Sequence, residues 1–469
     1  MKLTSHSRNI IFIYLGDAAS RLLGLVAVSY LARVLGPSDF GTISIGLAVL
    51  AYAMVLGNSG LKLLGTRKVA GETQNIESLT ANIIIARLLL SAITFSLGVY
   101  IIYVFVASQE VFHITRVYLL GVFPAALLLE WFFHGKRKLG IIAGGKIISM
   151  FFYLVIVLLF VKNNKDIIWV AWAWIIGIAA NCAFLWFIFK QKKYTVSFQR
   201  DKLKVRSLLL EAFPLGVAII IAQITTQFPP IYLGLVATKS DVGFFTAAFK
   251  VILFLLILDR VFYSVFFPNI SRCFNNFPDK LEAHVNAVLK ITTVSVLMIG
   301  LYAVVSGHYI IHFIFGSSFM HAVPIFQVLV GYFVLNLINS VFTFTLIGME
   351  KEKIYTRSLV SGMVVFFIVT FIVTEFMGTI GVASGLIAYQ LTSLIIMAAA
   401  LKRHILLNYI RSIILPVTGT ILLSVPLLLF ADLVFFVKII IITLIGFPYI
   451  IWLGGIGKDE LYYLKRKFI

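Results

Sequence analysis

Long apolar runs separated by short polar breaks are the feature of this sequence that most restricts its fold. The runs reach about 20 residues or more, enough for a helix to cross the roughly 30 Å hydrocarbon core of a bilayer. Hydrophobic residues make up 61% and charged residues 12% of the 469-residue chain, and the mean hydropathy is +1.03. A soluble domain has about 45–50% apolar and about 25% charged residues, so the composition excludes a water-soluble fold.

We therefore expect an all-α polytopic membrane protein with about fourteen transmembrane helices. The expected spans have approximate limits of Ile10–Ala32, Phe40–Leu64, Leu79–Val106, Thr115–Phe133, Leu139–Val161, Ile167–Phe189, Leu208–Val236, Val242–Phe267, Val285–Val305, Val323–Ile347, Tyr355–Thr374, Ile380–Leu401, Ile410–Phe430 and Leu433–Leu453. Breaks at 35–39, 375–379 and 431–432 are short enough to be tight hairpins. The longest break, 190–206, is too short for an extramembrane domain.

Lysine and arginine residues set the expected orientation. The chain has 39 Lys and Arg against 19 Asp and Glu, a formal net charge of +20. The cations gather in alternate breaks, for example 136–138 and 190–206, whereas the break with Lys162 and Lys165 belongs to the poorer set. By the positive-inside rule, both chain termini are expected in the cytoplasm. Because the basic charge then serves orientation, we expect no nucleic-acid partner.

Two similar segments indicate an internal repeat. Residues 30–41, the first repeat element, resemble residues 232–243, the second repeat element, and all their identities fall at one constant offset. The offset equals six spans, so both copies would enter the membrane in the same direction, as in transporters that hold their substrate between two halves. We predict a six-helix bundle with a basic cytoplasmic linker at 1–206, a second six-helix bundle at 207–403, and two additional helices with a cytoplasmic tail at 404–469.

Ionisable residues within the apolar runs are the candidate site residues, because each costs about 2.5–3.5 kcal/mol near the bilayer centre. Lys146 and Lys290 are expected to extend to the inner interface instead. The cations expected to line a substrate-binding cavity are Arg21, Arg87, Lys250 and Arg260.

Asp17 and Asp259 are candidates for ion coupling or for pairing with neighbouring cations. Asp17 and Arg21 lie four residues apart and can pair on one helical face. Lys250 and Arg260 lie ten residues apart in the eighth span, about 80° apart around the helix, so they can share one broad face. Asp259 would lie about 180° from Lys250, where it would contact a neighbouring helix instead.

The excess of cations over acids suits an anionic substrate, and a phosphate or pyrophosphate group fits well because guanidinium groups pair bidentately with phosphate oxygens. Residues 140–147 approximate a phosphate-binding loop, but Ile147 stands where Ser or Thr is required. The histidines and the two cysteines lack metal-ligand spacing. We therefore expect no enzyme activity, no metal and no cofactor. The Pro229–Pro230 pair should interrupt its span, as either a hinge or a packing kink.

Residues 30–41 followed by 60–70 resemble the bacterial polysaccharide flippases that move O-antigen and related repeat units. These belong to the multidrug/oligosaccharidyl-lipid/polysaccharide exporter superfamily, and the resemblance extends over the whole chain. It implies a multi-pass protein of the bacterial cytoplasmic (inner) membrane that carries an undecaprenyl-pyrophosphate-linked oligosaccharide across by alternating access. It further implies that the last two helices contribute a groove for the lipid tail.

Implied partners are the undecaprenyl-pyrophosphate-linked glycan, membrane lipid, and the polysaccharide polymerase and chain-length machinery. One alternative is a drug/cation antiporter of the same superfamily, whose cavity would be expected to carry an excess of acids. A second is a membrane glycan-processing enzyme, which would need catalytic groups on a substantial outer loop. The cation excess and the short outer breaks argue against both.

Overall fold

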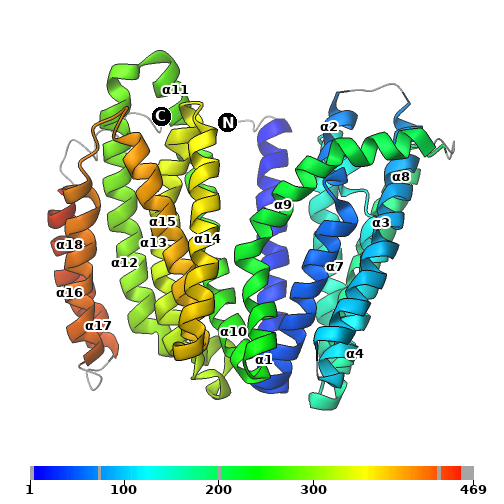
Figure 1. Ribbon diagram of the computed structural model, residues 1–469, viewed down its shortest axis with the longest axis horizontal. Helices are drawn as coiled ribbons and strands as arrows, with labels where there is room; N and C mark the ends of the chain where they lie inside the picture. Colours follow the sequence, from blue (N-terminus) through cyan, green and yellow to red (C-terminus); the bar gives the residue numbers. More distant parts are fainter. Residues whose placement is uncertain (1–4, 72–74, 107, 198–201, 430–434, 456–469) are drawn as a thin grey trace. The chain divides into compact units, whose positions relative to one another are not determined.

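The computed structural model describes residues 5–71, 75–106, 108–197, 202–429 and 435–455. Within these ranges it leaves out some side chains, among them those of residues 5–19, which include Asp17, and that of Arg21. In the described ranges the chain is predominantly helical and contains no strand, which confirms the expected all-α class. Two compact units divide it, unit 1 at Met1–Gly243 and unit 2 at Phe244–Ile469. Figure 1 labels most of the helices of each unit.

Unit 1 contains nine α-helices and one short 3₁₀ turn among its described residues. They are α1 (Ser5–Asn58), α2 (Leu61–Ala70), α3 (Ile76–Phe105), α4 (Gln109–Leu120), α5 (Val122–Ala126), α6 (Glu130–Gly135), α7 (Leu139–Phe160), η1 (Asn164–Asp166), α8 (Ile168–Gln191) and α9 (Lys202–Val236).

Helix α10 (Lys239–Leu255) runs across the boundary between the units. The remaining elements of unit 2 are α11 (Ile257–Asn276), η2 (Pro278–Lys280), α12 (Leu281–Phe315), η3 (Ser317–Phe319), α13 (Ala322–Gly348), α14 (Glu352–Met377), α15 (Thr379–Leu401), η4 (Ile410–Ile414), α16 (Leu415–Leu429), α17 (Phe435–Ile441), η5 (Ile442–Gly446) and α18 (Phe447–Gly454).

The chain is a multi-pass membrane protein. Among the described residues, ten helices are long and apolar enough to cross a membrane, and the two parts of α9, 205–221 and 223–236, form a further span bent by 58°. The bend lies before Pro229 and Pro230, within two turns of the pair that was expected to interrupt this span. The other expected spans correspond to shorter or interrupted helices, so the predicted count of fourteen agrees only approximately.

Helix α3 illustrates how these helices pack, with polar groups inside and apolar groups outside. Leu89, Ile93 and Leu97 follow one another at intervals of four residues, and all three are exposed. Arg87 and Ser91 lie on the buried side of the same helix. This distribution is the reverse of that in a soluble helix, because lipid solvates the apolar face and only protein neighbours can satisfy the polar one.

Two of the three expected hairpins coincide with backbone turns that require glycine. Gly36 has a φ of 72°, and it kinks α1 next to Pro37 within the predicted break at 35–39. Gly378 has a φ of 55° and separates α14 from α15, as the predicted break at 375–379 requires. A positive φ strains any residue with a side chain, which explains glycine at both positions. The third expected hairpin, at 431–432, lies outside the described residues.

The two repeat elements lie against each other within unit 1. A Cβ atom added to Gly41 would lie 1.9 Å from the carbonyl oxygen of Lys239, and one added to Gly243 would lie 2.0 Å from that of Pro37. Each element therefore places its glycine against a backbone carbonyl of the other. Only glycine allows such an approach, because any side chain would overlap the opposite backbone.

Helix α9 packs against α1, α2 and α3 and so belongs to unit 1. The contact with the α1–α2 junction is close, since a Cβ atom on Gly216 would lie 2.8 Å from the carbonyl carbon of Ser59. The repeat assigns α9 to the second bundle, whereas compactness groups it with the first. The bundle limits at 206 and 403 remain a prediction from the repeat.

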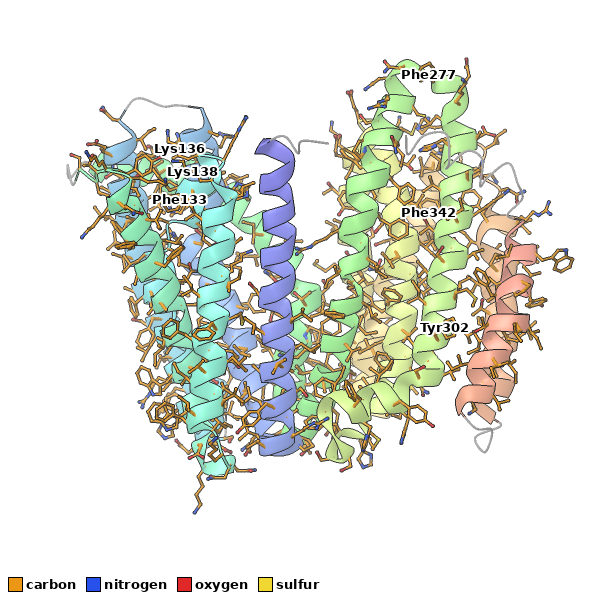
Figure 2. The ribbon with its side chains drawn as sticks, turned by 180° about the vertical axis from the view of Figure 1, so that it is seen from behind. Phe133, Lys136, Lys138, Phe277, Tyr302 and Phe342 are labelled. Carbon is orange, nitrogen blue, oxygen red and sulfur yellow. The ribbon has the colours of Figure 1, made fainter. Side chains whose placement is uncertain are left out.

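The last helices of unit 2 pack along α12, as Figure 1 shows for α16 and α18. An apolar cluster joins them, with Met298 and Leu301 on α12 packed against Ile442 and Ile450. Tyr302, labelled in Figure 2, forms a 2.7 Å hydrogen bond with Thr443 through its hydroxyl group.

The connection that leads into these helices is also fixed to α12. The backbone amide of Leu406 donates to the Glu282 carboxylate at 3.1 Å, and Asn286 donates to the carbonyl oxygen of Leu406 at 3.1 Å. Asn286 in turn accepts from the amide of Asn408 at 3.1 Å. The two additional helices are thus anchored to unit 2 by polar as well as apolar contacts.

Candidate functional site

A cavity of about 600 Å³ lies within unit 1, among α1, α2, α3, α7, α8, α9 and the segment from α5 to α6. Its lining includes three cationic side chains, Lys62, Arg87 and Lys146, and one acidic side chain, Glu130. Cations thus exceed acids among the described residues of the lining. This balance gives the cavity a positive potential, which attracts anions.

The fourth expected span, Thr115–Phe133, does not form one continuous helix. It is divided into α4, α5 and α6, and the backbone is non-helical from Leu127 to Leu129. The interruption frees carbonyl groups that helical hydrogen bonds would otherwise use. Such groups are tolerated at membrane depth only where protein partners satisfy them or where they line a cavity. Interrupted helices of this kind often mark the binding sites of transporters.

Side chains from neighbouring helices satisfy these carbonyl groups. Arg87 on α3 donates from Nη1 to the Leu128 oxygen at 2.9 Å and from Nη2 to the Ala125 oxygen at 2.6 Å. Trp186 on α8 donates from Nε1 to the Leu127 oxygen at 3.0 Å. Arg87 is therefore both a wall of the cavity and the clamp that fixes the interruption.

Glu130 follows the interruption as the first residue of α6, and its side chain is only 15% exposed. Its carboxylate accepts a hydrogen bond from Lys62 Nζ at 2.7 Å. The side chains of Lys146 and Asn181 also face it. The acid therefore neutralises one cation of the cavity directly and lies beside a second.

Several buried polar atoms of the lining residues have no hydrogen-bond partner among the described residues. Two are donors, Nε of Arg87 and Nε1 of Trp131, and one is an acceptor, Oδ1 of Asn181. Unpaired donors in a positive cavity suit a ligand rich in acceptors, such as a phosphate group. Gly145 on α7 makes room for Asn181, because a Cβ atom at position 145 would lie 2.1 Å from that amide oxygen.

Of the four cations predicted from the sequence, only Arg87 is placed at this cavity by the described side chains. Lys250 on α10 and Arg260 on α11 lie in unit 2, and Arg260 is exposed. The side chains of Arg21 and Asp17 lie outside the described residues. The sequence argument placed Lys250 and Arg260 on one face of a single span. The structure places a one-residue break at Leu256 between them, and their place on a shared face stays a prediction.

Asp259 lines a second, smaller cavity of about 180 Å³ inside unit 2. Its carboxylate accepts a hydrogen bond from Ser340 on α13, so it contacts a neighbouring helix as the helical geometry suggested. Asn339 donates to the side-chain oxygen of Gln390 at 2.6 Å, while its own oxygen has no partner among the described residues. Tyr355 also lines this cavity. One carboxylate with surrounding amide and hydroxyl oxygens is a ligand set suited to a small cation.

Sequence reasoning missed three charged residues of the unit 1 cavity. Lys146 was expected to extend to the inner interface, and neither Lys62 nor Glu130 was among the candidate site residues. Pro124, within the fourth expected span, is the signal that could have revealed them. A proline in a transmembrane helix frees a carbonyl group, and such interruptions tend to lie beside binding sites. The described residues include no group of three His, Cys, Asp or Glu side chains able to hold a metal ion.

Comparison with known proteins relates this arrangement to membrane transporters. Residues 7–274, more than half of the chain, match the family described as polysaccharide biosynthesis protein. A Shigella dysenteriae protein named for O-antigen transport is 25% identical over 410 residues, which cover 84% of this chain and 100% of the relative.

Two solved structures show the same fold at low sequence identity. The lipid II flippase MurJ, in an inward closed conformation, has a TM-score of 0.75 at 14% identity, covering 97% of this chain and 99% of its own. An inward-facing multidrug resistance MATE family transporter of the MOP superfamily has a TM-score of 0.63 at 15% identity. The match covers 82% of this chain and 96% of the transporter.

Proposed function

The chain belongs to the polysaccharide biosynthesis protein family, and on that premise we propose that it is a flippase for a lipid-linked oligosaccharide. The proposed substrate is an undecaprenyl-pyrophosphate-linked repeat unit of O-antigen or a related surface polysaccharide. The protein would carry it across the bacterial cytoplasmic membrane by alternating access. In the orientation predicted from the positive-inside rule, both chain termini are cytoplasmic. The polysaccharide polymerase and chain-length machinery remain the expected protein partners.

The observation that supports this proposal best is the cation-lined cavity inside a membrane-spanning unit. A drug or metal cation would be repelled by Lys62, Arg87 and Lys146, whereas a pyrophosphate group would pair with them. The unpaired donors of Arg87 and Trp131 add hydrogen-bonding capacity for phosphate or sugar oxygens. The cavity of about 600 Å³ is large enough for a charged headgroup with its first sugar, but not for a lipid tail of dozens of carbons.

The remaining parts of the substrate would be accommodated outside this cavity. The polyprenyl tail stays in lipid, and the two additional helices along α12 offer an apolar surface beside which it can lie. Outward movement of negative charge is favoured by about 2.3 kcal/mol per charge for each 100 mV of inside-negative potential. Hydrolysis of ATP is therefore not required for net export.

A complementation experiment tests the proposal. The gene is deleted in its host, and the strain receives either the wild-type gene or a variant with Lys62→Gln and Lys146→Gln. We expect the variant to leave lipid-linked oligosaccharide on the inner leaflet, because the cavity loses the charges that bind pyrophosphate. Lys192→Gln combined with Lys193→Gln, which removes two exposed cations of the linker, is the matched control and should restore export.

Surface glycan at wild-type levels in the double variant would contradict the proposed cavity. The predicted site residues Arg21 and Lys250 are tested in the same strain. Either residue exchanged for Gln should reduce export if both contribute to substrate binding, and unchanged glycan in both variants would exclude them.

We also propose that the Asp259 cavity of unit 2 binds a coupling ion, with Asp17 kept as a second candidate. The carboxylate of Asp259 and the unpaired oxygen of Asn339 support a small cation there. In proteoliposomes, transport should respond to an imposed Na⁺ or proton gradient, and Asp259→Asn should abolish the response while transport driven by membrane potential persists. A gradient response that survives Asp259→Asn would remove this residue from the coupling path.

A further inference from the structure

Glu130 is an acid in a cavity built for an anion, and the proposed transport step makes no use of it. Its carboxylate pairs with Lys62, and Lys146 and Asn181 also face it. Arg87 on α3 lies close enough to interact electrostatically with Glu130. A negative charge here weakens the attraction of the cavity for pyrophosphate. A site optimised only for tight binding would not contain it.

The two members of the ion pair differ in their freedom to move. Glu130 directly follows the interruption at 127–129, whose carbonyl groups are held by Arg87 and Trp186. Its side chain is 15% exposed, whereas that of Lys62 is 49% exposed. Lysine also carries its charge on a flexible four-carbon stem. The acid is therefore held in place while the base can turn toward a ligand.

We propose that Glu130 is an internal counter-ion, which holds Lys62 while the cavity is empty and yields it to the phosphate oxygens of a bound polyprenyl pyrophosphate. The inference rests on the proposed function and adds the residue that sets affinity and release. Pyrophosphate carries more negative charge than one carboxylate. When it enters, the Lys62 ammonium group therefore leaves Glu130 and pairs with the phosphate oxygens. Because Glu130 stays within reach, it recaptures the ammonium group as the substrate leaves.

Binding to the purified full-length protein tests this proposal, with farnesyl pyrophosphate as the probe. Glu130→Gln keeps the shape of the side chain and removes the competing charge. We expect it to lower the dissociation constant about fivefold, the effect of losing one partly exposed competing ion pair. In proteoliposomes the same variant should transport more slowly than wild type, because release is hindered. Tighter binding combined with slower transport is not expected from a merely structural residue.

A matched control is available in Glu211 on α9. Its carboxylate pairs with Arg67 at 3.1 Å and with Lys68 at 2.8 Å, and it is not among the residues that line the cavity. Glu211→Gln makes the same change of charge and should leave probe binding within about twofold of wild type. An equal gain in affinity in both variants would mean that only the net charge matters, and would overturn the specific role of Glu130.

The background variant Lys62→Gln separates this inference from the proposed function. If Glu130 acts mainly by competing for Lys62, most of the gain in affinity from Glu130→Gln should be lost in that background. Unchanged or weaker binding by a folded Glu130→Gln protein overturns the inference, while weaker binding by Lys62→Gln still supports the cavity. Failure of the wild type to bind the probe contradicts the proposed function and the inference together. If Glu130→Gln does not fold, Glu130→Asp, which lengthens the ion pair, should show a smaller gain in affinity.

Discussion

Arg87→Met separates two roles for the buried guanidinium group, substrate binding and support of the interrupted helix. The sequence presents Arg87 as a charge that meets the substrate, whereas the structure shows its two terminal nitrogens donating to the carbonyl oxygens of Leu128 and Ala125. Methionine retains most of the length and apolar contact of the side chain. The main consequence of Arg87→Met is therefore the loss of the positive charge and of these two hydrogen bonds.

The expected cost follows from what each carbonyl group retains. The Leu128 oxygen loses its charged donor, and a buried unpaired carbonyl costs about 1–3 kcal/mol. The Ala125 oxygen keeps a 3.3 Å bond from the amide of Leu128, so its loss lies at the low end of that range. The sum is about 2–4 kcal/mol. For a unit of this size, each kcal/mol lowers the melting temperature by about 2–4 °C, so we expect a decrease of about 4–16 °C.

Thermal unfolding followed by tryptophan fluorescence measures this change, because Trp131 and Trp186 lie at the interruption. Arg116→Met is the matched control, since its exposed guanidinium only lies 5.7 Å from the Phe112 ring and contributes about 0.5–1 kcal/mol at most. Arg87→Lys keeps the charge but can replace only part of the hydrogen bonding, and should fall between wild type and Met. An Arg87→Met protein with wild-type stability but no export would refute the clamp and restore a purely substrate-binding role.

Three further predictions follow from the described contacts. Gly145→Ala should weaken probe binding at least severalfold and lower the melting temperature, because its methyl group would lie 2.1 Å from the amide oxygen of Asn181; wild-type affinity would show that Asn181 does not shape the cavity. Gly243→Ala should destabilise the contact between the repeat elements, seen as a lower melting temperature and increased proteolysis, since its Cβ would lie 2.0 Å from an opposing carbonyl oxygen. Cysteines engineered at positions Asn163 and Lys192, both exposed, test orientation: an impermeant reagent should label the first and not the second in intact cells, and the reverse pattern would invert the predicted topology.

The hydrophobic pattern predicted most of the spanning helices, because the thickness of the lipid bilayer sets a minimum length for each of them. Runs of about 20 apolar residues could be recognised without tertiary information. The hairpin at 375–379 was predictable for a similar reason, since the break between the two spans is too short for anything but a tight turn. Gly378 supplies the positive φ of that turn. The interruptions at 127–129 and at Leu256 were not predicted, because the runs that contain them remain apolar.

The residues of the candidate site also divide into those that the sequence could predict and those that it could not. Arg87 was identified because an arginine deep within an apolar run is costly, and that cost can be read from the sequence alone. Its hydrogen bonds to the carbonyl groups of α5 and the following interruption could not be foreseen, because they depend on where the fourth span breaks. Glu130 and Lys62 lie far apart in the sequence, and each resembles an ordinary interfacial charge.

The sequence by itself determined that this chain is an all-helical membrane protein and that it carries more cations than acids within its spans. It also determined that both repeat elements end on glycine. Only the tertiary structure decided which charges share a cavity. Hydropathy measures the cost of placing each residue in lipid, one position at a time. The pairing of Lys62 with Glu130, by contrast, depends on α2 and α6 meeting beside α7, and that meeting is a property of packing among helices rather than of any one segment.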